Sequence, residues 1–239
     1  MSAARSWTAG AALAAALWAA GCAARPVPVG MPRPGVAAWE LPAALSQRQT
    51  LFRAQYRGPR GDGSFRLVLR LADPSRYELA ASDLLGRQLW TLSVAGGDAL
   101  FLDHRAARAC RLGGEVRLPD LGLPPLALNA VPALLLGRLP APPAPPVAPA
   151  GAGDYRDAAG RRWSFTLRGG EPASWTLWDD DGPALFWSRQ GSGGVLSARR
   201  EGAQLRWQTS QSEPLAAPPA PPSVPPGFAE GSCDEPRLP

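Results

Sequence analysis

The feature that most constrains this chain is an alternation of apolar and polar residues that recurs along most of its length. In residues 65–71, FRLVLRL, the Phe and the three Leu fall on one side, and Arg66 and Arg70 fall on the other. Because successive side chains of an extended strand point to opposite faces, this period of two predicts a strand with one buried face. A chain built from many such runs favours a β-rich domain over a helical bundle.

The same period marks the other predicted strands, each bounded by turn residues. The chain holds 28 Pro and 26 Gly among 239 residues, which agrees with short strands and frequent turns. About nine to eleven antiparallel strands are expected in a single sheet, which must curl to bury its aromatic face. Besides 65–71, the runs are 51–57, 77–81, 88–94, 99–103, 163–168, 174–178, 184–189 and 205–209, with 194–199 as a weaker one.

Two helices are expected beside the sheet. Residues 41–49, LPAALSQRQ, have Pro near the first turn and predict a short leading helix. Asn129 is placed to cap a second helix, which runs to Leu136 and ends at Gly137. The second helix is apolar nearly all round, so it should pack against the sheet rather than lie in water.

The N-terminus has the order of an export signal. Arg5 supplies a positive charge, residues 9–20 are apolar, and small residues follow. The apolar stretch is shorter than the about 20 residues that a membrane-spanning helix needs. Residues 1–21 are therefore predicted to be a signal peptide.

Residues 19–22, AAGC, resemble the lipobox of bacterial lipoproteins, with Ala19 at the position where Leu is usual. The resemblance implies cleavage before Cys22, a diacylglycerol on its sulfur and an acyl chain on its amine. Several chains, at about 0.8 kcal/mol per buried methylene, anchor a protein stably. Ala23, rather than Asp, resembles the sorting signal for the outer membrane. The alternative is an ordinary secretory signal cleaved after an A-x-A site, which leaves Cys22 free or absent.

Composition divides the rest of the chain. Residues 22–40 are rich in Pro and predict an extended tether, and residues 41–212 hold the predicted strands as one domain. Within that domain, residues 140–153, PAPPAPPVAPAGAG, predict an exposed low-complexity insertion, because the same strand pattern resumes after them. Residues 213–239 are a Pro-rich C-terminal tail.

Cys110 and Cys233 are the two cysteines that follow Cys22. Export leads to a compartment in which disulfides persist, so a bridge that ties the tail to the domain is one expectation. Two separate thiols are the other, because sequence alone does not place two Cα atoms within bonding reach.

Charge and motifs argue against several functions. The net charge is +5, but all basic residues are Arg and are spread along nearly every predicted strand, so no nucleic-acid partner is expected. The single histidine, His104, is either half of an acid–base pair with Asp103 or part of a solvated turn. Residues 179–182, DDDG, read as a turn rather than a calcium loop. Since the chain has no serine elbow, HExxH or CxxC, no enzymatic activity, metal or cofactor is expected.

Two segments resemble the lipoprotein-carrier superfamily to which LolA and LolB belong. Residues 72–103 begin with a strand opened by Pro, followed by a turn at Leu84, Leu85 and Gly86 and then by two strands that a small-residue hairpin connects. Residues 126–140 hold a helix that ends in LLLGRLP. The resemblance implies a mainly β, α+β fold: a LolA/LolB-like incomplete antiparallel barrel, covered by helices, around an apolar cavity. Leu84 and Leu85 are the candidates for the exposed loop that LolB uses at a membrane. The alternative for them is a strand entry packed in the core.

Nine Trp are the most unusual part of the composition. Five of them fall on predicted strands in phase with Leu or Phe, which indicates either a large aromatic core or the lining of a cavity that takes acyl chains. The cavity candidates are Trp90, Leu92, Val94, Trp163, Phe165, Leu167, Trp175, Leu177, Trp187, Leu205 and Trp207.

These expectations combine into a lipoprotein of the outer membrane that faces the periplasm as a monomer. It is expected to bind lipid or lipoprotein acyl chains in a half-barrel cavity during lipoprotein sorting or insertion. Its expected partners are the membrane, through the N-terminal lipid anchor, and a periplasmic lipoprotein carrier or acylated proteins. The alternative is a non-catalytic structural or interaction lipoprotein in envelope assembly.

Overall fold

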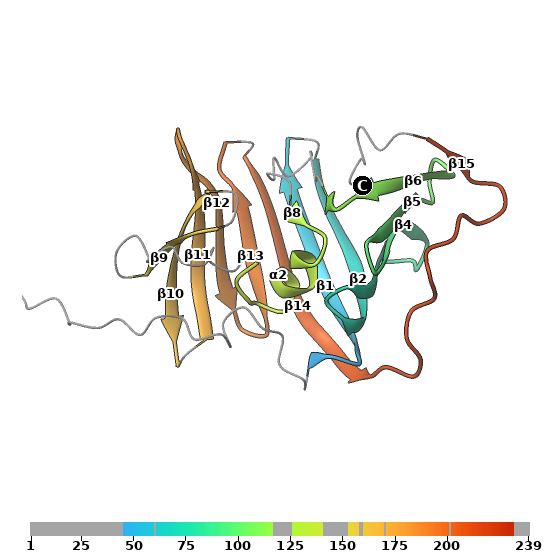
Figure 1. Cartoon of the computed structure of the whole chain (residues 1–239), viewed down its shortest axis with the longest axis horizontal. Helices are drawn as coiled ribbons and strands as arrows, with labels where there is room; N and C mark the ends of the chain where they lie inside the picture. Colours follow the sequence, from blue (N-terminus) through green and yellow to red (C-terminus); the bar gives the residue numbers. More distant parts are fainter. Residues whose placement is uncertain are drawn as a thin grey trace, which may run out of the picture. The chain divides into compact units, whose positions relative to one another are not determined.

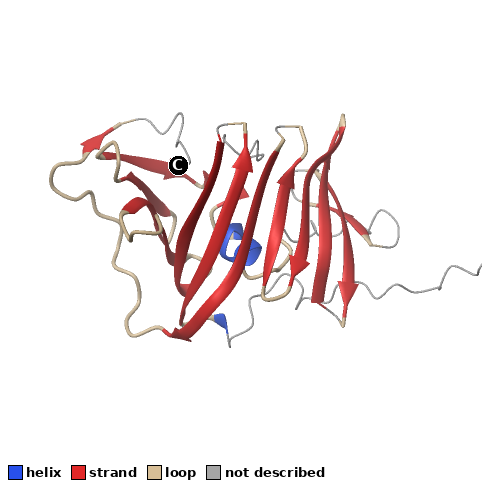
Figure 2. Cartoon of the chain, turned by 180° about the vertical axis from the view of Figure 1, so that it is seen from behind, coloured by secondary structure: helices blue, strands red, loops and turns tan. Residues whose placement is uncertain are grey.

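The computed structural model of the chain describes residues 45–59, 61–116, 126–140, 153–157, 160–169, 171–200 and 202–231. All of them belong to one compact unit, Pro32–Pro239. Strands dominate this part of the chain, as the alternation predicts (Figure 1, Figure 2). The expected signal peptide, Cys22, the tether and most of the insertion lie outside the described residues.

The described strands form one large sheet and one small one. Thirteen strands make the large sheet, in the order β15-β6-β5-β4-β3-β2-β1-β14-β13-β12-β11-β10-β9, and β7 pairs with β8 alone. The order does not return to its start, so the sheet is open. The bounds are β1 Arg48–Gly58, β2 Gly61–Asp73, β3 Arg76–Ser82, β4 Gln88–Ala95, β5 Asp98–Asp103, β6 Arg108–Gly113, β7 Glu115–Val116, β8 Leu126–Ala127, β9 Asp154–Arg156, β10 Arg162–Arg168, β11 Glu171–Asp179, β12 Gly182–Gln190, β13 Gly193–Ala198, β14 Ala203–Pro214 and β15 Ala229–Glu230.

Strand β1 joins two meanders of consecutive antiparallel strands. It pairs with β2 along its whole length, and on its other side it pairs with β14, with Arg48 opposite Pro214 and Arg57 opposite Gln204. The first meander runs from β1 to β6 and the second from β9 to β14. The large aromatic and aliphatic side chains of both meanders gather in one hydrophobic cluster on the inner face of the sheet.

Helix α2 (Ala130–Leu135) lies against this inner face, in front of the centre of the sheet in Figure 1 and behind it in Figure 2. All six of its residues are buried, as its apolar sequence predicts, and Gly137 with φ +71° ends it. The Trp207 indole N–H donates to the Leu135 carbonyl at 3.0 Å, and the buried Tyr77 hydroxyl donates to the Leu128 carbonyl at 2.7 Å. Burial raises the pKa of Tyr77 far above its usual value, so this hydroxyl stays a donor.

The C-terminal tail crosses the outer face of the sheet. Figure 1 shows it, in red, passing beside β4 to β6 before it forms β15, which pairs in parallel with β6. Val224 and Phe228 pack on a second, smaller cluster of Leu100, Leu102 and Ala109. This contact explains why β5 is buried on both faces, with all four of its central residues, 99–102, buried.

The predicted disulfide is described only at one end. Cys110, in β6, is disulfide-bonded, whereas Cys233 lies outside the described residues. The pairing of these two cysteines therefore stays a prediction.

The strands expected from the alternation are confirmed, and most are one to several residues longer than predicted. The predicted helix over 41–49 is wrong at its end, because Arg48 and Gln49 already pair with β2 and β14; residues 41–44 lie outside the described part. The mostly antiparallel open sheet agrees with the expected incomplete barrel. The expected cover of helices is limited, in the described residues, to the single short helix α2.

Candidate functional site

The predicted cavity residues share one surface of the sheet. Leu167 and Leu205 are half-buried and the other nine are buried, and all eleven belong to the inner hydrophobic cluster. They come from strands of both meanders, from β4 to β14. The alternation thus placed these side chains on the same face correctly, and the structure brings the two halves of the set together.

An aromatic row forms the inner face of the second meander. Tyr155 stacks on Trp163 with ring centroids 6.0 Å apart, Trp163 meets Trp175 edge to face at 5.3 Å, and Trp175 stacks on Trp187 at 6.0 Å. Such pairs contribute about 0.5–1.5 kcal/mol each beyond the burial of their area. The sequence pattern did not predict Tyr155 as part of this face, because β9 is only three residues long and follows the low-complexity insertion.

The indole N–H groups of this face divide into two kinds. Trp163 donates to the Asp157 carboxylate at 3.0 Å, and Trp207 donates to a carbonyl of α2. The buried indole nitrogens of Trp90, Trp175 and Trp187, in the described part of the chain, have no acceptor. A buried donor without an acceptor costs about 1–3 kcal/mol, so these three N–H groups are the ones on this face with hydrogen-bonding capacity left over.

Helix α2 and the turn after it cover part of the aromatic row. The Arg189 guanidinium donates to the Gly137 carbonyl at 3.1 Å and to the Pro172 carbonyl at 3.0 Å. Arg138 forms an ion pair with Glu171 at 3.2 Å. Trp163 and Trp187 are 0% exposed, so in this structure their rings are fully covered rather than open to solvent.

The turn between β3 and β4 presents the two predicted leucines to solvent. Leu84 is 62% exposed and Leu85 is 82% exposed, and they are the only large hydrophobic side chains of the described residues that are exposed. The alternative of a strand entry packed in the core is therefore wrong for them. We call residues 83–87 the leucine turn.

A surface pocket of about 410 Å³ lies at the other end of the sheet, beside the β11–β12 turn. Its three arginines all have partners: Arg161 contacts Asp157 at 2.7 Å, Arg162 contacts Asp154 at 2.8 Å, and Arg156 donates to the Gly160 carbonyl at 2.7 Å. The Asp179–Gly182 segment connects β11 to β12, as expected for a turn, with Gly182 at φ +122°. Within the described residues no three His, Cys, Asp or Glu side chains are grouped to hold a metal ion.

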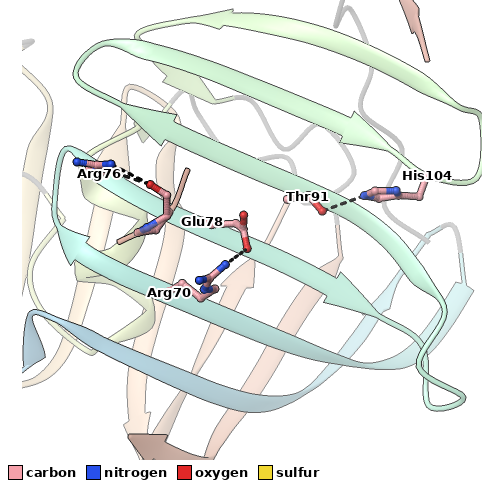
Figure 3. Close-up of polar contacts among 6 residues, drawn as sticks. Arg70, Arg76, Glu78, Thr91 and His104 are labelled. Atoms are coloured by element: carbon pink, nitrogen blue, oxygen red, sulfur yellow. Dashed lines mark hydrogen bonds and ion pairs between the residues drawn. The ribbon is translucent and has the colours of Figure 1, made fainter. Parts of the chain in front are cut away.

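His104 follows β5 at a turn, but its ring is less solvated than predicted. Its Nε2 atom is hydrogen-bonded to the Thr91 hydroxyl at 2.9 Å (Figure 3), and Phe228 of the tail packs edge to face on the ring at 5.4 Å. The Asp103 carboxylate instead accepts the backbone N–H groups of Arg105 and Ala106. Arg76 reaches the tail, where it donates to the Pro219 carbonyl at 3.1 Å. Figure 3 also shows the pairing of Arg70 with Glu78.

The packing of His104 predicts a pH dependence of stability. Burial lowers the pKa of His104, an effect that Asp103 partly opposes, so the folded chain favours the neutral ring. The unfolded chain then binds more protons, and this contribution, present above the usual value of 6.5, is lost as pH falls. The free energy of unfolding, measured in urea between pH 7 and pH 5, is expected to fall less in His104→Gln than in the wild type. An equal fall in the free energy of unfolding in both proteins would show that His104 does not contribute to this pH dependence.

No helix among the described residues is both long enough and apolar enough to cross a membrane.

No protein-family model and no curated protein matches the chain. It is similar to the solved structure of a LolA superfamily protein from Nitrosomonas europaea, with 8% identity, a TM-score of 0.45, and coverage of 73% of this chain and 87% of that chain. It is also similar to a DUF1329 family protein from Desulfovibrio piger, with 10% identity, a TM-score of 0.44, and coverage of 72% of this chain and 87% of that chain. A third similar structure is an outer membrane lipoprotein-sorting protein domain from Vibrio parahaemolyticus. Its identity is 8% and its TM-score is 0.40, and the match covers 74% of this chain and 87% of that chain.

Proposed function

We propose that this chain is a non-catalytic envelope lipoprotein that receives acyl chains of lipids or lipoproteins on its inner aromatic face, in lipoprotein sorting or insertion at the outer membrane. Cys22 is the attachment point of its lipid anchor, and residues 22–40 are the tether. A periplasmic carrier or an acylated protein supplies the chains. The observation that carries the proposal is the leucine turn, which exposes two adjacent large apolar side chains, whereas the other large hydrophobic side chains of the described residues are buried or half-buried.

The leucine turn fits a brief contact with a bilayer. Full transfer of a leucine side chain out of water is worth about 1.5–3 kcal/mol, so Leu84 and Leu85 together give a weak and reversible attachment. A lipid anchor holds the protein near the membrane, whereas the turn touches and leaves it. Such a division of labour suits a protein that passes its cargo into the bilayer.

The inner face fits the cargo. Its cluster is apolar, which matches acyl chains, and the unpartnered indoles of Trp90, Trp175 and Trp187 match the ester or amide oxygens at the head of such chains. The resemblance of residues 72–103 and 126–140 to the lipoprotein-carrier superfamily agrees with this reading. Because Trp163 and Trp187 are fully buried in this structure, uptake requires the groups packed over them to move.

One observation favours a second function. The aromatic row is packed on itself and covered, and Trp163 and Trp187 are fully buried. A sheet filled by its own side chains suits a structural or interaction lipoprotein in envelope assembly, which binds no acyl chain.

The test uses the full chain with Cys22→Ala, so that no lipid anchor holds it on a membrane. We expect it to bind a fluorescent fatty acid with quenching of Trp emission, and to bind vesicles of phosphatidylethanolamine and phosphatidylglycerol. Leu84→Ser with Leu85→Ser should weaken vesicle binding roughly a hundredfold and leave fatty-acid binding unchanged. The half-buried Leu215 supplies the control, Leu215→Ser, which should not change vesicle binding.

Two results would decide against the proposal. Failure to bind the fatty acid favours the structural function, because the interior then takes no chain. Equal vesicle binding with and without the two leucines would contradict a membrane contact of the leucine turn.

A further inference from the structure

The leucine turn is built around one carboxylate. Asp83 Oδ1 accepts the backbone N–H of Leu85 and of Arg87, both at 2.9 Å, and Oδ2 accepts the Arg87 Nε–H at 2.6 Å. The backbone adds two bonds inside the same turn: Asp83 N–H to the Arg87 carbonyl at 3.0 Å, and Gly86 N–H to the Asp83 carbonyl at 3.1 Å. Five hydrogen bonds thus join four of the five residues of the turn.

A glycine supports this conformation together with the hydrogen bonds. Gly86 has φ +85°, a region that residues with a side chain rarely adopt, and it lets the chain reverse directly after the leucines. The Asp83 side chain is 18% exposed and lies inside the turn, whereas the leucine side chains point away from it into solvent. The hydrogen bonds of Asp83 therefore fix the shape of the turn, and the two leucine side chains remain exposed to solvent.

The same bonds suit the turn to a medium with little water. An amide N–H that enters an apolar region without an acceptor is costly. Four backbone N–H groups of the turn, those of residues 83, 85, 86 and 87, already donate within it, and the Asp83 carboxylate accepts two of them. Desolvation raises the pKa of Asp83, but the bonds from Arg87 and Leu85 outweigh it and hold that pKa below its usual value. Its negative charge is neutralised by Arg87.

We propose that Asp83 is the positioning residue of the membrane contact: it keeps Leu84 and Leu85 exposed and satisfies the backbone of the turn, so that the turn enters a bilayer without a conformational change. This inference rests on the proposed function, because it assumes that the leucine turn touches a membrane. Asp83 itself does not contact the acyl chains of the bilayer; it acts through the turn.

The test again uses the full chain with Cys22→Ala and vesicles of phosphatidylethanolamine and phosphatidylglycerol. Asp83→Ala removes both carboxylate oxygens and is expected to weaken vesicle binding roughly tenfold, as loss of a capping carboxylate does for a helix end. Asp83→Asn keeps an acceptor at the position of Oδ1 and should restore most of the binding. Arg87→Gln, which removes only the ion pair, should give a smaller loss than Asp83→Ala.

Asp179 supplies a matched control. In the β11–β12 turn its Oδ1 accepts the Asp181 N–H at 3.0 Å and contacts Arg200 at 2.8 Å, so it has the same kinds of partner without leucines beside it. Asp179→Ala should leave vesicle binding unchanged, and thermal unfolding should show that both variants are folded. Amide hydrogen exchange at Leu85 and Arg87 should be faster in Asp83→Ala.

The outcomes separate this inference from the function on which it rests. If the double leucine variant loses vesicle binding and Asp83→Ala does not, the positioning role is wrong and the proposed function stands. If neither change matters, the membrane contact itself is wrong. Equal losses in Asp83→Ala and Asp179→Ala, or no rescue by Asp83→Asn, would also overturn the role of Asp83.

Discussion

Gly193→Ala is expected to destabilise the sheet by about 3 kcal/mol or more and to leave much of the protein unfolded or insoluble. An added Cβ would overlap the backbone oxygen of Trp207 and lie 2.7 Å from the Cα of Gln208. Both atoms belong to the main chain of β14, which is hydrogen-bonded to β1 on its other side, so it has no room to retreat. Circular dichroism during thermal unfolding measures the effect.

Gly63 is the matched control for this prediction. It also lies in a strand, β2, but nothing would lie within 4 Å of an added Cβ. Gly63→Ala should be neutral or stabilise the protein by up to about 1 kcal/mol, because Ala restricts the unfolded chain. Equal unfolding temperatures for the two variants would show that β13 and β14 are not as close as described.

Trp187→Ala is expected to cost about 3–5 kcal/mol and to lower the unfolding temperature by roughly 10 °C. The ring is fully buried, stacks on Trp175 and lies beneath the Arg189 guanidinium at 6.0 Å. Its loss leaves a cavity between the sheet and the turn after α2. Urea unfolding followed by far-UV circular dichroism gives the free energy.

Trp178 offers the comparison on the other face of the same sheet. Its ring is half-buried, donates to the Ser164 hydroxyl at 2.8 Å and lies under Arg162. Trp178→Ala should cost about 1 kcal/mol, since one hydrogen bond and a partly exposed contact are lost. A cost equal to that of Trp187→Ala would contradict the assignment of inner and outer faces.

The inner face was predictable because it depends on a local property. Alternation along each strand fixes which side chains share a side, and that is enough to group Trp90 with Leu92 and Trp163 with Phe165. What alternation does not determine is the filling of the space in front of them. The choice between aromatic core and cavity depends on where α2 sits, which is a tertiary contact.

Other elements were missed for reasons that are equally physical. Strand β6, RACRLG, is polar enough to lack the pattern, and it is held by β5 on one side and by the tail on the other. Arg48 and Gln49 follow a helix-like LPAAL segment, yet pairing with two neighbouring strands outweighs that local preference. The exposure of Leu84 and Leu85 follows from the bonds of Asp83, which the order of residue types alone does not reveal.

The central pairing of β1 with β14 has a consequence for how the chain folds. Arg48 donates to the Ser212 hydroxyl across 164 positions of sequence, whereas every other antiparallel strand of the large sheet pairs with its immediate predecessor or successor. Bringing such distant ends together has a large entropic cost and slows folding. The two meanders are therefore expected to assemble first and separately. The inner face is completed only when β14 pairs with β1. A partly folded chain therefore presents two separate apolar half-sheets instead of one shared core.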